Sequence, residues 1–342
     1  LYLSEKGILK SHRFERALIR CAANLSYQDV QAAVDGQPNE EAEPFLDPVL
    51  RPLYGAYDAI HKARLKRGPL ELDLPERKVI LDDEGMVAAV NKRERLTAHR
   101  LVEDFMIAAN VAAAETLERQ RTALLYRVHE EPSAEKIEAL REYLDGFDIR
   151  LAKGQVTRPA IFNRVLKRAK DTAFEDGVSD MVLRSQMQAY YSPENLGHFG
   201  LALGRYAHFT SPIRRYADLI IHRALIAAHK LGDDGLQNQD LMRLAETAEH
   251  ISKTERRAML AERDSLDRYL AAFYERHRGE VFKGRISGVT RFGLFVKVEP
   301  AGGDGFVPAA QMGADYFHHD EKRQALIGEI TGDAFQLGDT ID

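Results

Sequence analysis

Residues 208–224 have the sequence HFTSPIRRYADLIIHRA, the most informative stretch of this 342-residue chain. Ser211 and Pro212 form a typical helix start, because an N-cap serine oxygen accepts a backbone N–H and proline fixes φ at the first helical position. The apolar residues that follow recur at helical spacing. The stretch therefore predicts a helix that starts directly after Ser211 and continues to about residue 231.

Two adjacent arginines, Arg214 and Arg215, fall in the first turn of this predicted helix. The helix dipole is positive at that end, so cations there need an anion beside them. A phosphate held by the helix N-terminus and the arginine pair is one candidate. The alternative is an ion pair with Asp218, four residues after Arg214 and three after Arg215. The residues alone leave both interpretations open.

The segment around these arginines resembles the hallmark motif of the ribonuclease II/ribonuclease R (RNB) family of 3′→5′ exoribonucleases. Residues 194–219, ENLGHFGLALGRYAHFTSPIRRYADL, are most similar to the bacterial ribonuclease R branch. The similarity covers nearly the whole chain and keeps the family's order of motifs. It implies processive hydrolysis of single-stranded RNA to nucleoside 5′-monophosphates, with Mg²⁺ as the cofactor.

Composition places the chain among ordinary globular proteins, with 44% hydrophobic residues and length enough for two domains. Its single cysteine, Cys21, excludes an internal disulfide framework and is typical of a reducing compartment. No apolar run approaches the roughly 18–20 residues of a membrane span, and no signal peptide is recognisable. We therefore expect a cytoplasmic protein that does not associate with membranes.

The net charge of −5 is not that of a simple electrostatic nucleic-acid binder, which would be basic overall. RNA affinity must then come from local basic patches or an interior channel. Basic residues cluster within residues 62–67 and again within residues 256–268. Both clusters can equally be solvated helix faces.

Helical patterns dominate the chain up to about residue 270. Ser26 and Asp29 form a capping box for a short helix, and residues 78–91 predict a β-hairpin around Asp-Glu-Gly. Residues 97–119 predict a strongly amphipathic helix, whose expected core face comprises Leu101, Phe105, Ala108, Ala109 and Ala112. Further helices are expected at residues 52–67, 133–144, 161–170, 181–189 and 241–274.

The composition changes near Gly279, after which EVFKGRISGVTRFGLFVKVEP predicts successive strands of a small β-barrel. This part resembles an S1 domain, an RNA-binding OB-fold, and the sequence stops near its fourth of five strands. We therefore expect an α+β fold. The mostly helical C-terminal part of an RNB catalytic domain occupies residues 1–276, and an incomplete S1 domain occupies residues 279–342.

The family's metal-binding aspartates have the spacing Asp-x₅-Asp-x-Asp-Asp, which does not occur in this sequence. Two-metal phosphodiester hydrolysis needs such a carboxylate cluster. The acidic residues 82–84 and the run His318–Asp320 are expected to lie in loops. We therefore assign no metal ligand to this chain, expect the Mg²⁺ ligands upstream of it, and expect the isolated chain to be inactive.

The resemblance implies that this chain carries the substrate half of the active site. Tyr27 matches a tyrosine near the scissile end of the RNA, and Arg214 matches the arginine on the scissile phosphate. Glu103 and Glu262 match glutamates near the terminal nucleotide. The alternatives are a half-buried helix tyrosine and solvated helix glutamates, although Glu262 has no basic neighbour at helical spacing.

Further substrate-binding residues are expected in both domains. The motif contributes Tyr206, His208 and Arg215. In the S1 segment, Lys283 is expected to contact phosphate, and Phe292 and Phe295 are expected to stack on bases. Alternatively, both rings fill the barrel core. Leu72 and Pro308 depart from the family pattern, which has an aromatic residue and a histidine there.

Two other functions compete with an exoribonuclease. The first is an RNA-binding remnant without catalysis, which the absent aspartate cluster suggests. The second sets the resemblance aside: a helical scaffold with an OB-fold adaptor for protein partners, which would have no RNA affinity. Salt-sensitive RNA binding would exclude the second.

Overall fold

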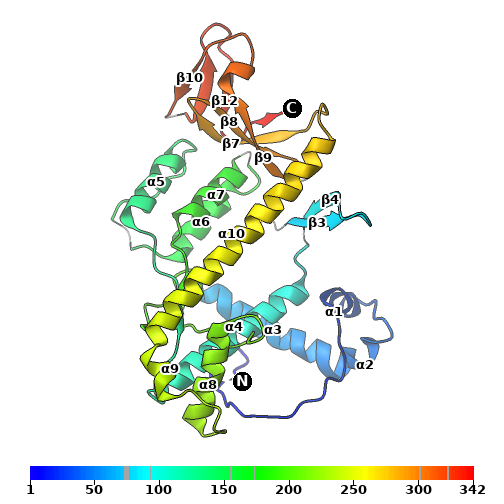
Figure 1. Cartoon of the computed structure of the whole chain (residues 1–342), viewed down its shortest axis with the longest axis vertical. Coiled ribbons are helices and arrows are strands. Elements are labelled where there is room, and N and C mark those ends of the chain that lie inside the picture. Colours follow the sequence, from blue (N-terminus) through cyan, green and yellow to red (C-terminus); the bar gives the residue numbers. More distant parts are fainter. Residues whose placement is uncertain (73–76, 93, 155, 173, 300–301, 322) are drawn as a thin grey trace. The chain divides into compact units, whose positions relative to one another are not determined.

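The computed structural model describes residues 1–72, 77–92, 94–154, 156–172, 174–299, 302–321 and 323–342 (Figure 1). The chain divides into two compact units. The first comprises residues 1–70, 94–130 and 188–255, and the second comprises residues 71–93, 131–187 and 256–342. Both units combine helices with small antiparallel sheets, which confirms the predicted mixture of helix and sheet.

The first unit is mainly helical. Its helices are α1 (Tyr27–Val34), α2 (Glu43–Phe45), the π-helical turn η1 (Leu46–Leu50), α3 (Arg51–Arg67), α4 (Thr97–Arg119), α8 (Tyr216–His229), α9 (Asn238–Met242) and the start of α10 (Leu244–Arg276). Its strands form two antiparallel pairs, β1 (Tyr2–Leu3) with β2 (Leu9–Ser11) and β5 (Tyr126–Val128) with β6 (Tyr190–Ser192). The capping box predicted at Ser26 is present.

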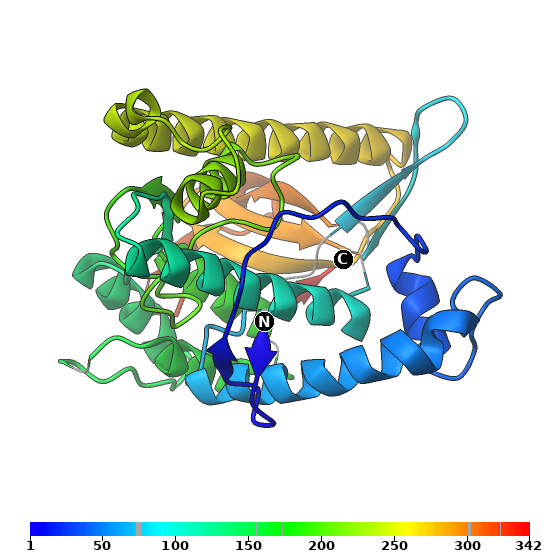
Figure 2. The same ribbon diagram turned by 90° about the horizontal axis from the view of Figure 1, so that it is seen from below.

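Figure 2 shows β1 and β2 beside α3. The turn between the two strands contains Gly7, whose φ is +71°. A Cβ atom at this position would lie 2.0 Å from the carbonyl oxygen of Ala59 in α3. Both the left-handed conformation and the close backbone approach therefore require glycine here.

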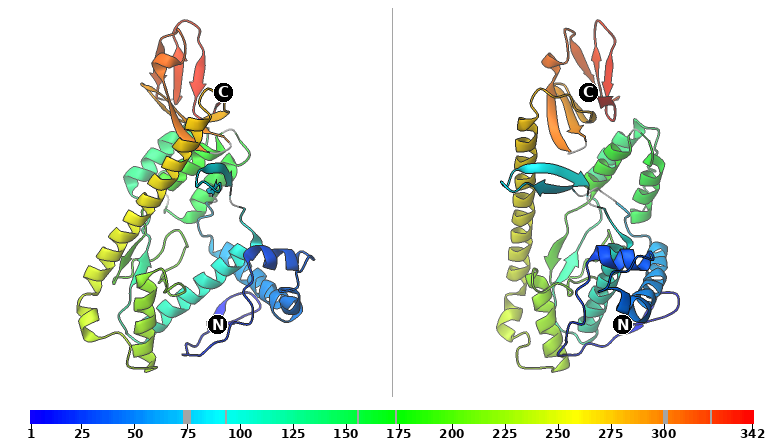
Figure 3. Two further views of the ribbon diagram at one scale, coloured as in Figure 1. Left: turned by 45° about the vertical axis from the view of Figure 1, so that its right-hand side comes forward. Right: turned by 90° about the vertical axis from the view of Figure 1, so that its right-hand side faces the viewer.

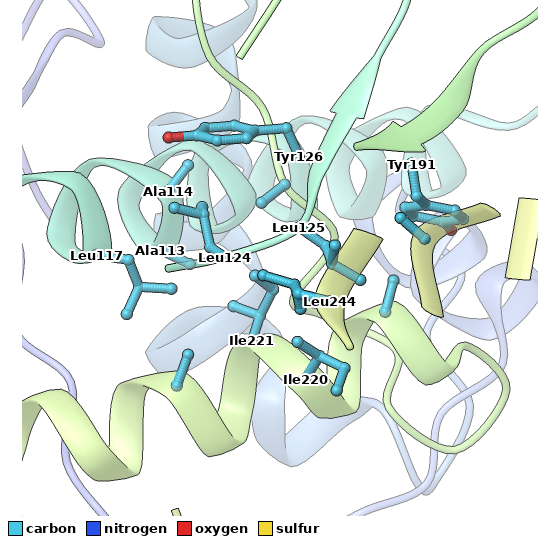
Figure 4. Close-up of a cluster of buried hydrophobic side chains, with 14 of the residues drawn as sticks. Ala113, Ala114, Leu117, Leu124, Leu125, Tyr126, Tyr191, Ile220, Ile221 and Leu244 are labelled. Atoms are coloured by element: carbon cyan, nitrogen blue, oxygen red, sulfur yellow. The ribbon is translucent and has the colours of Figure 1, made fainter. Parts of the chain in front are cut away.

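The core of the first unit lies between α4 and α8 (Figure 4). Leu117 of α4, Leu125 beside β5 and Ile221 of α8 are fully buried there. Small residues such as Ala113 and Ala224 are also fully buried, which leaves room for the larger side chains to interdigitate. This core fixes the start of α8, and hence the loop that precedes it.

Helix α4 has the predicted bounds, but its buried face differs from the predicted one. Phe105, Ala108 and Ala109 are only partly buried, whereas Asp104 and Asn110 are 2% and 1% exposed. The prediction counted only apolar residues as core. It failed because these two polar side chains have hydrogen-bond partners inside the protein.

The described residues of the second unit form three antiparallel sheets and the remaining helices. Its helices are α5 (Ala134–Asp145), α6 (Pro159–Ala169), α7 (Glu175–Ser185), the rest of α10 and the 3₁₀ turn η2 (Ala309–Gln311). Its strands are β3 (Arg77–Leu81), β4 (Val87–Lys92), β7 (Gly284–Thr290), β8 (Gly293–Val298), β9 (Gly303–Pro308), β10 (Phe317–Asp320), β11 (Ala325–Gly328), β12 (Ala334–Gln336) and β13 (Thr340–Ile341).

The hairpin β3–β4, predicted from its turn residues, packs on α10 (Figure 3). Val87 and Val90 are buried against Leu270 of α10. The middle of α10 has no such cover, because residues 256–265 are exposed on every side of the helix. Met259 and Leu260 are 51% and 46% exposed.

The C-terminal part has the OB-fold expected of an S1 domain. A four-stranded sheet in the order β13-β7-β8-β9 and a three-stranded sheet in the order β10-β11-β12 enclose a core around Ile286, Leu294 and Leu326. His318 and His319 lie in β10, so the prediction of a loop was wrong. The neighbouring Phe317 packs edge-on against Phe335 of β12 and holds this strand in place.

The helix predicted at residues 181–189 is also displaced. The structure has α7 at Glu175–Ser185 instead, and the chain is already in strand β6 at Tyr190. The Ser185 hydroxyl donates to the carbonyl of Val182, and the extended conformation of Gln186 ends the helix. In the described part of the chain, no helix combines the length and apolar character needed to cross a membrane.

Candidate nucleic-acid interface

The arginine loop, residues 206–215, leads into α8, and its geometry differs from the prediction. Helix α8 begins at Tyr216 with Arg215 as its N-cap, and residues 212–214 form a turn. The carbonyl of Ser211 accepts the N–H of Arg214 at 3.3 Å and of Arg215 at 3.1 Å. The N-cap predicted at Ser211 was therefore wrong. The Ser211 N–H instead donates to the Asp218 carboxylate at 2.7 Å, which pulls the loop back over the first helical turn.

Arg215 forms the ion pair that was one of the two interpretations of the arginines. Its Nε lies 2.7 Å from Oδ2 of Asp218 and its Nη2 lies 2.8 Å from Oδ1. The Asp218 side chain is fully buried. This two-point contact occupies Arg215, so this arginine stabilises the loop.

Arg214 is in the opposite situation. Its side chain is exposed and has no hydrogen-bond or ion-pair partner among the described residues. The neighbouring Ile213 is also fully exposed. The Arg214 guanidinium lies beside a helix N-terminus, on a loop that the Asp218 carboxylate fixes in place. Such a guanidinium is suited to bind an anion such as phosphate. The ion-pair interpretation therefore applies to Arg215, whereas phosphate binding stays a prediction for Arg214.

The side chains of Tyr206 and His208, both within the arginine loop, are buried or partly buried instead of lying on the surface. Tyr206 is 7% exposed, and its hydroxyl accepts a 2.9 Å hydrogen bond from Nδ2 of Asn110. His208 is partly buried, and its Nδ1 shares a 2.9 Å hydrogen bond with the Tyr191 hydroxyl. The structure thus offers no direct RNA contact by the Tyr206 hydroxyl, and both residues support the loop from within.

Side chains of the arginine loop join an aromatic cluster inside the protein. The cluster comprises His129, Tyr191, His198, Tyr206 and His208. The rings of His129 and His198 are 5.1 Å apart, His198 and Tyr206 are 5.2 Å apart, and Tyr206 and His208 are 5.5 Å apart. Nδ1 of His129 accepts the Gly200 N–H at 2.9 Å, and Nδ1 of His198 accepts the Leu201 N–H at 3.2 Å. These backbone donors require both imidazoles to be unprotonated at Nδ1.

Burial controls the protonation of this histidine cluster. It lowers the pKa of His198 to about 3, with the charges of His129 and Arg127 adding to the effect. It lowers the pKa of His208 to about 2, and the nearby Arg215 and Arg127 lower it further. Both histidines are therefore neutral at physiological pH.

Glu103 lies on α4 and is neither free nor simply solvated. Its Oε1 accepts from Nη1 of Arg64 at 2.9 Å, and its other oxygen pairs with Arg95. The same Arg64 also pairs with the buried Asp104, whose second oxygen lies 3.0 Å from Nδ1 of His61. Arg64, within the basic cluster predicted at residues 62–67, is thus used in holding α3 against α4.

One face of α4 connects three parts of the predicted site. Tyr27, 40% exposed, stacks on His99 with ring centroids 4.1 Å apart. Glu103 follows His99 by four residues, and Asn110, which binds the arginine loop, follows Glu103 by seven. These spacings keep all three on one side of the helix, along about 16 Å at 1.5 Å per residue.

The second unit carries the other predicted residues. Glu262 lies on the exposed part of α10, and no ion pair or hydrogen bond holds its carboxylate within the described ranges. Phe292 and Phe295 are 65% and 45% exposed, which excludes the alternative that they fill the barrel core. Lys283 is exposed as well.

Sequence reasoning missed Phe306, which belongs with the exposed aromatic rings. It lies directly opposite Phe295 in the β8–β9 register, with ring centroids 5.0 Å apart, and is 46% exposed. The Cζ atom of Arg291 lies over the face of the Phe292 ring, 4.5 Å from its centroid. The alternation of side chains in GDGFVP was the available signal for Phe306.

Within the described residues, no group of three or more histidine, cysteine, aspartate or glutamate side chains could hold a metal ion. The residues that the structure describes therefore do not fit a catalytic metal centre.

Comparison with known proteins gives two family matches. The sequence pattern of the RNB domain matches residues 1–230, and that of the S1 RNA binding domain matches residues 276–341. Ribonuclease R of Aquifex aeolicus is 39% identical over 343 residues, which cover all of this chain and 48% of that protein. Ribonuclease R of Escherichia coli is 36% identical, covering 99% of this chain and 43% of that protein. The chain thus spans about half the length of these relatives.

Solved structures show the same similarity. Mycoplasma genitalium RNase R in complex with ribose-methylated single-stranded RNA has a TM-score of 0.83 and 27% identity, covering 92% of this chain and 50% of the other. Yeast Ssd1, a pseudonuclease, has a TM-score of 0.66 and 18% identity over 88% of this chain and 37% of its own. The second similarity shows the fold alone.

Proposed function

This chain belongs to the RNB family, and from that membership we propose that it forms part of a 3′→5′ exoribonuclease. The proposed enzyme hydrolyses single-stranded RNA processively to nucleoside 5′-monophosphates. The observation that carries the proposal is the exposed, unpaired guanidinium of Arg214 on a loop that buried side chains hold in place. The ribonuclease R relatives and the RNA-bound structural neighbour support it.

We assign Arg214 to the scissile phosphate. Its planar fork of N–H donors matches phosphate oxygens, and it can stabilise the charge that develops as the pentacovalent phosphorane forms. Arg215 has a different role, because Asp218 already occupies two of its nitrogens. We propose that Arg215, Tyr206 and His208 act by positioning the loop.

We assign Tyr27 and Glu103 to the terminal nucleotide. The exposed part of the Tyr27 ring offers a stacking face. A carboxylate has about four lone-pair sites, and the two arginines leave part of the Glu103 carboxylate able to accept a ribose hydroxyl. A contact to the 2′-hydroxyl would distinguish RNA from DNA. Glu262 is proposed to approach the same end of the substrate.

The S1 aromatic patch, Phe292, Phe295 and Phe306, is proposed to bind RNA with Lys283. Base stacking on aromatic side chains tolerates any sequence and contributes about 1–3 kcal/mol per base. Lys283 adds a phosphate contact. Stacking of this kind fits an enzyme without sequence preference. The local contacts would provide RNA affinity although the net charge of the chain is −5.

RNB nucleases generally use a divalent metal, and we propose Mg²⁺ with ligands outside the described residues of this chain. Such an ion would supply Lewis-acid activation of the scissile phosphate. We also propose a cytoplasmic location, in line with the exposed free thiol of Cys21. The proposed domain border lies between residues 276 and 279, where α10 ends.

The proposed function is tested by mixing this chain with a 5′-labelled single-stranded RNA, with and without Mg²⁺, and separating the products on a gel. We expect binding that weakens steeply as salt rises, because phosphate contacts release counterions. We expect no shortened products, because the chain supplies only the substrate half of the site. Absence of RNA binding at low salt would refute the proposal. A Mg²⁺-dependent ladder would support the exonuclease and overturn the assignment of its metal ligands.

Arg214→Ala should weaken binding of that RNA about fivefold to tenfold, as expected for the loss of one charged phosphate contact. The slope of log affinity against log salt should also fall by about one. Arg214→Lys should retain part of the affinity, because the charge remains but the planar fork is lost. A fluorescence anisotropy titration measures all three effects.

The matched control for that titration is Arg119→Ala, which removes an exposed arginine from the far end of α4. Its affinity and salt slope should equal those of the unmodified chain. Equal losses in the two variants would mean that Arg214 contributes only general positive charge.

A further inference from the structure

We propose that Asn110 is a positioning residue for Arg214, and this inference rests on the proposed function. Asn110 lies on α4 and is 1% exposed. Its side-chain nitrogen and its side-chain oxygen both form hydrogen bonds with the arginine loop. Nδ2 donates to the Tyr206 hydroxyl at 2.9 Å. Oδ1 accepts the N–H of Phe209 at 2.8 Å and that of Thr210 at 3.2 Å.

Two buried side chains thereby determine the backbone of the arginine loop. Three consecutive N–H groups, those of Phe209, Thr210 and Ser211, donate to side-chain oxygens instead of to regular secondary structure. Asn110 accepts the first two, and Asp218 accepts the third. These three hydrogen bonds are partly buried, so the loss of either side chain would leave loop N–H groups without their acceptor.

Asn110 also relates the arginine loop to the rest of the proposed substrate site. It lies on the same face of α4 as Glu103, seven residues away. Arg214 follows Thr210, the last residue that Asn110 binds, by four residues. The Asn110 amide therefore sets where Arg214 leaves the protein surface relative to Glu103. Loss of this contact should release the loop and misplace the guanidinium without removing any charge.

A buried, hydrogen-bonded asparagine could also serve only to stabilise the fold. The test must therefore separate an effect on protein stability from an effect on the position of Arg214. A double-mutant cycle does this, because it measures whether two substitutions act on binding through one another. The cycle compares the full chain, Asn110→Ala, Arg214→Ala and the double variant for affinity to the 5′-labelled single-stranded RNA. Thermal melting of each variant establishes that it is folded at the assay temperature.

We expect Asn110→Ala to weaken RNA binding about fivefold in the unmodified chain and less than twofold when Arg214 is already alanine. Asn110→Asp should restore most of the affinity, because its carboxylate can still accept both loop N–H groups. Thr116→Val is the matched control. It removes another buried hydrogen bond of α4, the one to His12, and should lower the melting temperature with unchanged affinity.

Equal losses from Asn110→Ala in both backgrounds, or no loss, would overturn the positioning role. If Asn110→Ala does not fold, Asn110→Thr replaces it in the cycle, because its hydroxyl can accept one of the two N–H groups. A smaller effect of Asn110→Thr when Arg214 is alanine then supports the positioning role, and equal effects in both backgrounds overturn it. Failure of the proposed function is distinguishable: the unmodified chain would not bind RNA, or Arg214→Ala would bind as tightly as the unmodified chain.

Discussion

Asp218→Ala should lower the free energy of unfolding by about 3–5 kcal/mol, the usual effect of removing one partner of a buried ion pair. The Asp218 side chain is fully buried, holds Arg215 at two points and accepts the N–H of Ser211. The substitution leaves a partly buried guanidinium and a loop N–H without their acceptor. Urea denaturation followed by circular dichroism measures the change.

Glu246→Ala is the matched control for Asp218→Ala. Glu246 lies in the first turn of α10 and, like Asp218, pairs with an arginine three residues before it, Arg243. Both partners of this pair are exposed. Exposed pairs contribute little to stability, so the midpoint of denaturation should not change measurably. If Asp218→Ala behaves like this control, the buried pair does not hold the arginine loop.

Lowering the pH should destabilise the first unit at pH values that are still above the range in which its carboxylates become protonated. Burial lowers the pKa of His198 to about 3 and of His208 to about 2, whereas both side chains titrate near 6.5 in the unfolded chain. Between these values the unfolded chain binds more protons, so stability present above about pH 6.5 is lost as the pH falls. Each histidine contributes a slope of about 1.4 kcal/mol per pH unit.

Urea denaturation between pH 7 and pH 4.5 measures this loss, which should approach about 3 kcal/mol per pH unit for the two histidines together. In the variant His198→Gln, which cannot take up a proton, the slope should fall by about half. A stability that stays flat down to pH 5 would show that the two imidazoles are solvated in the folded protein.

The sequence predicted most helices well because their boundaries depend on local residues. The capping box at Ser26 and the full extent of α4 follow from neighbouring side chains and from apolar periodicity. The start of α8 failed because a tertiary contact overrides the local signal. Asp218 accepts the Ser211 N–H from within the helix and leaves Pro212 in a separate turn.

The exposed residues of the candidate site could be predicted from the sequence, whereas its buried residues could not. Arg214 and the S1 phenylalanines stand out by residue type and motif. Asn110 and Asp104 do not, because a polar residue in an amphipathic helix is normally solvated. Their partners lie far along the chain: Arg64 precedes Asp104 by 40 residues, and Phe209 follows Asn110 by 99. Only the folded structure reveals such pairs.

The exposed middle of α10 has a consequence for how this chain opens locally. Residues 256–265 pack against no core, so their helical turns depend on intrinsic propensity and on pairs such as Arg263 with Asp267. Opening these turns breaks only local hydrogen bonds and leaves both hydrophobic cores intact. Their amide protons should therefore exchange with solvent far sooner than those of α4 around Leu117. We therefore expect this part of the helix to open and close locally without any change in the buried cores.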